Sequence, residues 1–166
     1  DYTSFVPLIG AGDEAAACHM TWNDQELNNN EGMFLELAGA YARYHCPCSR
    51  TLFLGSPPQQ YLDIEKVISE CIENAISMFK PGNTCAEISD NFTATLKKYG
   101  YEKNNRCGYP IGLSYPPDWG ERTMSLRGTD QTILQENMTF HFMPAIWFDD
   151  WGFEMTESIR VGDNGG

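Results

Sequence analysis

Three side chains of the sequence have the chemistry needed to move protons: His19, Glu36 and Glu154. Glu36 stands between Leu35 and Leu37 in an apolar stretch. Burial there would raise the pKa of its carboxyl group, because the charged form is poorly solvated in apolar surroundings. Such a carboxyl group can activate water or attack an electrophilic carbon directly. Histidine side chains titrate near neutrality, which suits His19 to act as a general acid or base.

Two of these residues also have a purely structural interpretation. His19 falls in a loop, where a histidine often only bonds to the backbone, and charges near a C-terminus are usually solvated. Alternation along a strand places Glu154 on the same face as Thr156 and Glu157 on the opposite face. We therefore expect Glu154 to lie beside Glu36. Glu157 is kept as a candidate for substrate binding only.

A loop rich in proline and tryptophan, residues 113–122, could form a site for an organic cation. It reads Leu-Ser-Tyr-Pro-Pro-Asp-Trp-Gly-Glu-Arg, and aromatic faces attract delocalised cations. The alternative is a rigid loop that serves packing alone. The pattern favours a pocket for a cationic or zwitterionic small molecule. The candidate binding residues are Tyr115, Asp118, Trp119, Glu121 and Trp147.

The composition excludes several partners. The chain has 166 residues, a formal net charge of −12, and 42% hydrophobic residues, which is enough for one domain with its own core. An acidic chain does not favour nucleic acid or an anionic membrane surface, both of which need a basic face. No apolar run approaches a membrane span, and the first residues do not resemble a signal peptide. We expect a cytoplasmic protein, and the missing initiator Met suggests a fragment of a longer one.

Six cysteines could form three disulfides or remain as free thiols. Cys71 and Cys85 fall in expected helices, and Cys46 and Cys48 are too close in sequence to pair easily. The spacing favours reduced thiols, and it contains no zinc-binding pattern.

The expected elements are strands at both ends with two helices between them. The first strands are expected at 2–9, as a strand pair within 33–45, and at 49–55. Apolar residues at helical spacing predict a long helix over 61–79, which follows two prolines and stops at Lys80-Pro-Gly. Thr84 can cap a second helix that ends at Gly100. The buried stripe of this helix is expected to contain Ile88, Phe92, Thr95, Leu96 and Tyr99. Further strands are expected at 107–113, 138–148 and 151–161, with Pro144 limiting the regularity of the second.

Two segments resemble the metal-site strands of the pita-bread superfamily, which includes methionine aminopeptidases, prolidases and creatinase. They are Glu36 to Thr51 and Cys107 to Leu113. The resemblance implies an α+β fold in which helices pack outside a curved antiparallel sheet. It implies that residues 1–166 are a partial catalytic domain, without the first helix pair and without the family's N-terminal domain. It also implies a homodimer for the full-length protein.

The same resemblance implies a lost metal site. The metallopeptidases of the superfamily bind two metal ions through two Asp, one His and two Glu. The matching positions here hold Glu36, Pro47, Tyr109, Met143 and Thr156. Such a set cannot hold two divalent ions, so we expect no metal and no other cofactor. Tyr109 then becomes a candidate substrate-binding residue, and His19 matches a loop histidine that faces the substrate in the superfamily.

Within the superfamily, the strings Phe34 to Gly39, Arg43 to Thr51 and Gly108 to Glu121 are similar to those of the ectoine hydrolase branch. This similarity implies metal-independent hydrolysis of a C–N bond in a cyclic amidine, as part of compatible-solute breakdown. Two alternatives remain open at this point. One is an Xaa-Pro dipeptidase or aminopeptidase that requires metal, and the other is a catalytically dead module that only binds partners.

Overall fold

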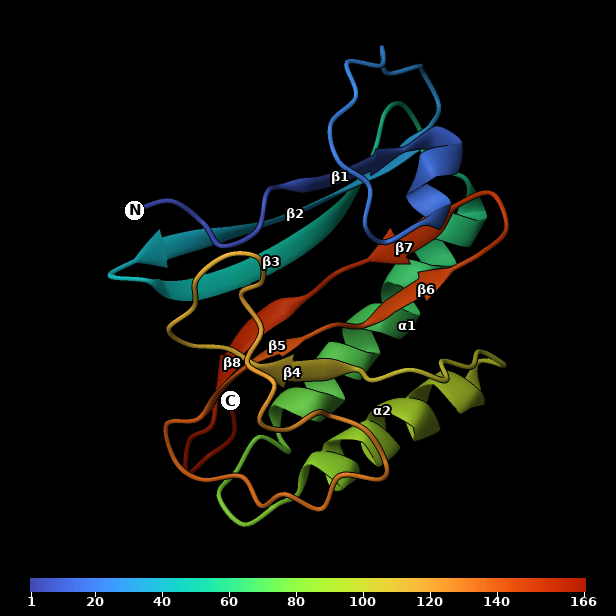
Figure 1. The fold of residues 1–166 in the computed structure, drawn as a ribbon. Coiled ribbons are helices and arrows are strands. Elements are labelled where there is room, and N and C mark those ends of the chain that lie inside the picture. Colours follow the sequence, from blue (N-terminus) through green and yellow to red (C-terminus); the bar gives the residue numbers. More distant parts are fainter.

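The computed structural model describes residues 1–166 and shows an α+β chain in which all the sheets are antiparallel. Figure 1 shows two helices lying together against the C-terminal strands, while a long hairpin extends away from them. The N-terminal elements are β1 (Leu8–Ala11), the 3-10 helix η1 (Gly12–Ala16), β2 (Gly32–Tyr41) and β3 (Tyr44–Phe53). The helices are α1 (Gln59–Ile76) and α2 (Cys85–Lys98). The C-terminal strands are β4 (Gly108–Pro110), β5 (Thr139–Phe142), β6 (Ala145–Trp147), β7 (Gly152–Glu154) and β8 (Glu157–Arg160).

The long hairpin carries one wall of the site. β2 pairs with β1 and β3, and Glu36 lies opposite Ser49. A strand pair does begin within 33–45: β2 runs to Tyr41 and the chain reverses at Ala42 and Arg43, but β3 starts at Tyr44 and not at Ser49 as expected. Ala42 and Arg43 have φ angles of 48° and 67°, a left-handed turn that is usually signalled by glycine or asparagine.

The guanidinium group of Arg43 fastens this turn to its neighbours. It donates hydrogen bonds of 3.1 and 2.7 Å to the Ser114 carbonyl oxygen and one of 2.7 Å to Ser4 Oγ. The turn is therefore stabilised by tertiary contacts rather than by turn-forming residues, which explains why its sequence did not indicate it.

The C-terminal strands are shorter and more numerous than expected. The segment 138–148 divides into β5 and β6 on either side of Met143 and Pro144, which confirms the limit set by the proline. The segment 151–161 divides into β7 and β8 in the same way. β4, β5 and β8 form one sheet, while β6 and β7 form a separate pair. The first strand is also shorter than expected, because pairing begins only after Pro7, which has no amide hydrogen to donate.

The helices form as their apolar spacing predicts. Thr84 caps α2: its hydroxyl accepts a 3.2 Å hydrogen bond from the Glu87 amide, and the Glu87 carboxylate accepts one of 2.7 Å from the Thr84 amide. Tyr99 does not join the buried stripe of α2. It is 49% exposed, and its hydroxyl donates to the carboxylate of Glu70 on α1.

The main hydrophobic core lies between the two helices and the C-terminal strands. Phe79 packs on Phe140 and Phe142 of β5 with ring centroids 5.7 and 5.8 Å apart, and Phe92 of α2 packs on Phe142 at 5.9 Å. This core fixes the sheet that presents Tyr109 and His141 on its other side. Neither α-helix is long and apolar enough to cross a membrane.

Candidate functional site

A cavity of about 860 Å³ lies where β1, β2, β4, β6, β7 and α2 meet. It is lined by seven of the ten residues that the sequence analysis singled out. They are His19, Glu36, Tyr109, Asp118, Trp119, Trp147 and Glu154. Residues far apart in the chain thus converge on one site, as the sequence analysis predicted for Glu36 and Glu154.

The other three predicted residues lie outside this cavity. Tyr115 is 59% exposed and packs under the guanidinium group of Arg43, 4.8 Å from the ring centroid. Glu121 lines an adjoining polar pocket that shares Arg106, Tyr109, Asp118 and Arg127 with the cavity. Glu157 forms a 2.5 Å ion pair with Arg50. Of the aromatic residues proposed for substrate binding, Tyr109, Trp119 and Trp147 therefore line the cavity and Tyr115 does not.

Two carboxyl groups are buried at the bottom of the cavity. Glu36 is 5% exposed and Glu154 is 4% exposed. Burial raises the pKa of Glu36 to about 7. Burial, and to a smaller extent the nearby charge of Glu36, raises the pKa of Glu154 to about 8. Two such groups cannot both ionise easily near neutral pH, so the pair retains a proton there.

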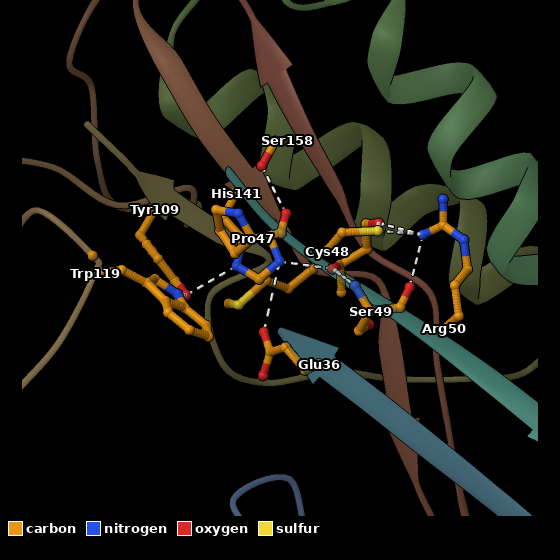
Figure 2. A network of polar contacts seen from close by, with 12 residues as sticks. Glu36, Pro47, Cys48, Ser49, Arg50, Tyr109, Trp119, His141 and Ser158 are labelled. Carbon is orange, nitrogen blue, oxygen red and sulfur yellow. Dashed lines mark hydrogen bonds and ion pairs between the residues drawn. The ribbon is translucent and has the colours of Figure 1, made fainter. Parts of the chain in front are cut away.

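A hydrogen-bonded chain reaches Glu36 from the aromatic side of the site. Trp119 Nε1 donates to the Tyr109 hydroxyl at 2.8 Å, and this hydroxyl lies 2.9 Å from His141 Nδ1. His141 Nε2 lies 2.7 Å from Thr156 Oγ1 and 3.7 Å from Glu36 Oε1. Figure 2 shows the imidazole ring between the phenol and the carboxylate.

The hydrogen-bond partners in this network determine which nitrogen of His141 carries the hydrogen. Burial, followed by the positive charges of Lys103 and Arg106, lowers the pKa of His141 to about 3, so the ring is neutral. Trp119 can only donate, so the Tyr109 hydroxyl accepts that bond and turns its own hydrogen toward Nδ1. We therefore assign the hydrogen of the neutral ring to Nε2, where it faces Thr156 and the Glu36 carboxylate.

Sequence reasoning missed His141 and Lys103. His141 is fully buried on β5, two residues before a position that was compared with a metal ligand. A histidine in an apolar strand that faces a predicted metal-site strand was a usable signal. Lys103 lies in a polar loop segment, Glu-Lys-Asn-Asn-Arg, and nothing in that segment indicates that it reaches a cavity.

The side chains at the five compared positions do not suit a dinuclear metal centre. Pro47 has no donor atom in its side chain, and Met143 offers a thioether, a weak partner for hard divalent ions. The hydroxyl groups of Tyr109 and Thr156 are already bonded to His141. No three His, Cys, Asp or Glu side chains of the chain are grouped so that they could hold a metal ion.

Comparison with known proteins identifies the family. The sequence profile of metallopeptidase family M24 matches residues 1–164. The chain belongs to this family. An ectoine hydrolase of Halomonas elongata is 52% identical over 166 residues, which span 99% of this chain and 42% of that relative.

Solved structures confirm the pita-bread fold of this M24 chain. A prolidase from Pyrococcus furiosus superposes with a TM-score of 0.88 at 24% identity, over 98% of this chain and 48% of the prolidase. An X-Pro aminopeptidase from Thermotoga maritima gives a TM-score of 0.89 at 19% identity, over 99% and 46%. The chain spans less than half the length of these relatives and of the ectoine hydrolase.

The buried carboxyl pair predicts that stability falls as pH rises. In the folded state the pKa values of about 7 and 8 lie above that of an unfolded Glu, so the folded state holds more protons in between. This stabilisation is fully present below about pH 4.5 and is lost as pH rises through the folded pKa values. The unmodified protein should lose this stabilisation between pH 5 and pH 8.5, and Glu154→Gln should lose less of it. The difference in unfolding free energy between the two should therefore shift by roughly 2–4 kcal/mol in favour of Glu154→Gln over that range.

Urea unfolding at several pH values measures this difference. Glu65→Gln is the matched control, because it removes an exposed carboxyl group of α1 that has no ion pair and lies outside the cavity, and it should leave the pH dependence unchanged. An unchanged pH dependence in Glu154→Gln would show that the pair does not hold a proton at neutral pH.

The hydrogen-bonded chain predicts a second stability effect. Tyr109→Phe leaves the indole N–H of Trp119 and Nδ1 of His141 without partners inside the protein, which should cost roughly 1–3 kcal/mol of unfolding free energy. Tyr41→Phe provides the control, since Tyr41 is 87% exposed. Equal denaturation midpoints for the two variants would contradict the network.

Proposed function

We propose that the chain is the catalytic part of a metal-independent hydrolase that opens a cyclic amidine, ectoine or a close analogue, at a C–N bond. The observation that carries the proposal is the pair of buried carboxyl groups, Glu36 and Glu154, in a cavity that also contains three aromatic rings. The similarity to the ectoine hydrolase of Halomonas elongata supports ectoine as the substrate and compatible-solute breakdown as the setting.

The cavity suits the charge and shape of an amidinium ring. A protonated amidine is a flat, delocalised cation, so its charge is attracted by carboxylates and by aromatic faces. Trp119 is 3% exposed and packs against Phe5, while Trp147 packs edge-on against Phe34. These rings are therefore held in place before a substrate arrives, and the carboxyl pair, which keeps one proton near neutral pH, supplies one negative charge in the same cavity.

Glu36 acts at the amidine carbon in this proposal. It either takes a proton from water, whose oxygen then bonds to that carbon, or bonds to the carbon itself and is released by water. In both routes one C–N bond breaks, the carbon becomes an amide carbonyl, and the departing nitrogen gains a proton. The proton that the carboxyl pair retains near neutral pH is available for that nitrogen.

Two histidines have different parts. His19 is exposed at the cavity wall, where its ring lies 5.9 Å from that of Phe5, and it passes protons between the site and solvent. His141 is a positioning residue. Its neutral Nε2–H donates to Thr156 Oγ1, and the ring lies 3.7 Å from Glu36 Oε1, so it limits how that carboxyl group can turn and leaves the other oxygen to face the substrate.

The two alternative functions receive less support. A metal-dependent Xaa-Pro peptidase requires a ligand set that the side chains at the five compared positions do not provide. A binding module without catalysis leaves the burial of Glu36 and Glu154 unexplained, because burying two carboxyl groups costs stability and a protein that only binds partners gains nothing from it.

Glu36→Gln tests the assignment of the reacting group. The amide keeps the size of the side chain but can neither accept a proton from water nor attack the carbon. Turnover of ectoine should therefore fall at least about 1,000-fold, while the circular dichroism spectrum stays unchanged. Glu31→Gln, near the start of β2 and outside the cavity, is the matched control and should retain full activity. Comparable activity of Glu36→Gln and the unmodified protein would remove Glu36 from the mechanism.

A further inference from the structure

Positively charged side chains are concentrated around the cavity although they are scarce in the chain. The sequence has 11 Lys and Arg against 23 Asp and Glu. Three of these few cations, Lys103, Arg106 and Arg127, nevertheless line the cavity. None of the three takes part in the chain's ion pairs, which involve other residues. Three cations without an ion pair that line one cavity of an acidic protein favour an anionic ligand there.

Lys103 is the cation most closely associated with the two carboxyl groups. Its ammonium group donates one hydrogen bond of 2.8 Å, to the Met143 carbonyl oxygen. The side chain is half-buried, and burial lowers its pKa, while the charge of Glu154 is among those that raise it. An ammonium group has three donors, so two remain available to a ligand.

Arg106 is held over the aromatic wall of the same cavity. Its guanidinium carbon lies 4.5 Å from the centroid of the Tyr109 ring. Stacking fixes the plane of the group while its N–H donors remain free, and these donors match the two oxygens of a carboxylate. Arg127 is exposed and lies farther out on the cavity wall.

Two further acidic residues, Asp118 and Asp90, line the cavity, and the first of them has partners of its own. Asp118 is engaged elsewhere, because one oxygen accepts a 2.9 Å hydrogen bond from the Gly120 amide and the other lies 3.7 Å from Arg122. Asp90 of α2 lines the cavity on the side of Gly128. The cavity is therefore lined by two buried carboxyl groups, Glu36 and Glu154, which we call its acidic floor, and by two less buried cations, Lys103 and Arg106, which we call its cationic wall.

We infer that Lys103 and Arg106 form a subsite for the carboxylate of the substrate, so the protein selects cyclic amidines that carry a carboxylate on the ring. This inference rests on the proposed function. The protein would then recognise both charges of a zwitterionic substrate. The acidic floor holds the amidinium, and the cationic wall holds the carboxylate and fixes which ring carbon faces Glu36.

The test compares ectoine with the same ring lacking the carboxylate, 2-methyl-1,4,5,6-tetrahydropyrimidine. Calorimetry gives the Kd of each compound for the intact protein and for Lys103→Met, which keeps the length of the side chain without its charge. The unmodified protein should bind ectoine roughly 10–100-fold more tightly than the analogue. Lys103→Met should weaken ectoine binding by a similar factor, about 10–100-fold, and change binding of the analogue far less.

Several outcomes would overturn the subsite. They are equal affinity of the unmodified protein for the two compounds, binding of neither compound, or equal weakening of both by Lys103→Met. The first comparison needs no variant, so a folding defect does not obscure it. Lys66→Met on the exposed face of α1 is the matched control and should leave both Kd values unchanged.

Turnover measured on the same samples separates this inference from the proposed function. Carboxylate-dependent binding without ring opening would support the subsite and contradict the hydrolase. Ring opening of ectoine and the analogue with equal kcat/KM would support the hydrolase and contradict the subsite.

Discussion

The burial of two carboxyl groups in one cavity is the constraint on which the rest of this structure depends. Glu36 and Glu154 come from strands far apart in the chain, and neither can lose its proton without cost to the fold. The surrounding strands create that cost by burying the two carboxyl groups, and a nearby positive charge reduces it. The β2–β3 hairpin places Glu36, the β6–β7 pair places Glu154, and Lys103 provides a nearby positive charge that lowers both pKa values.

Two of the positions that the family resemblance compares with metal ligands take part in hydrogen bonds here. Tyr109 and Thr156 bond to the two nitrogens of a neutral His141, and the Ser49 amide donates to Thr156 Oγ1 at 2.8 Å. Polar groups that would otherwise be buried without partners are thereby satisfied, and Nε2 of His141 lies 3.7 Å from Glu36 Oε1. In this account, a fixed arrangement of hydrogen-bond donors and a retained proton replace the charge of metal ions.

Much of the fold and part of the site could be predicted from the sequence, for identifiable physical reasons. Apolar spacing located both helices, and the apolar neighbours of Glu36 correctly indicated its burial. The turn at Ala42 and Arg43 was missed because the tertiary bonds of Arg43, rather than local residue preference, stabilise it. Lys103 and His141 were missed because their roles depend on contacts with distant segments, and Tyr115 was misplaced because its ring packs under Arg43.

The central claim is hydrolysis of a cyclic amidine without a metal ion, and the most direct test is proton NMR of ectoine incubated with the intact protein. The protein is first treated with a strong chelator, and its residual metal content is measured. The account predicts that the ring methyl signal is replaced by that of an acetamide at a rate that neither chelator nor added divalent metal changes. Ring opening that stops on chelation and returns with added metal would contradict it.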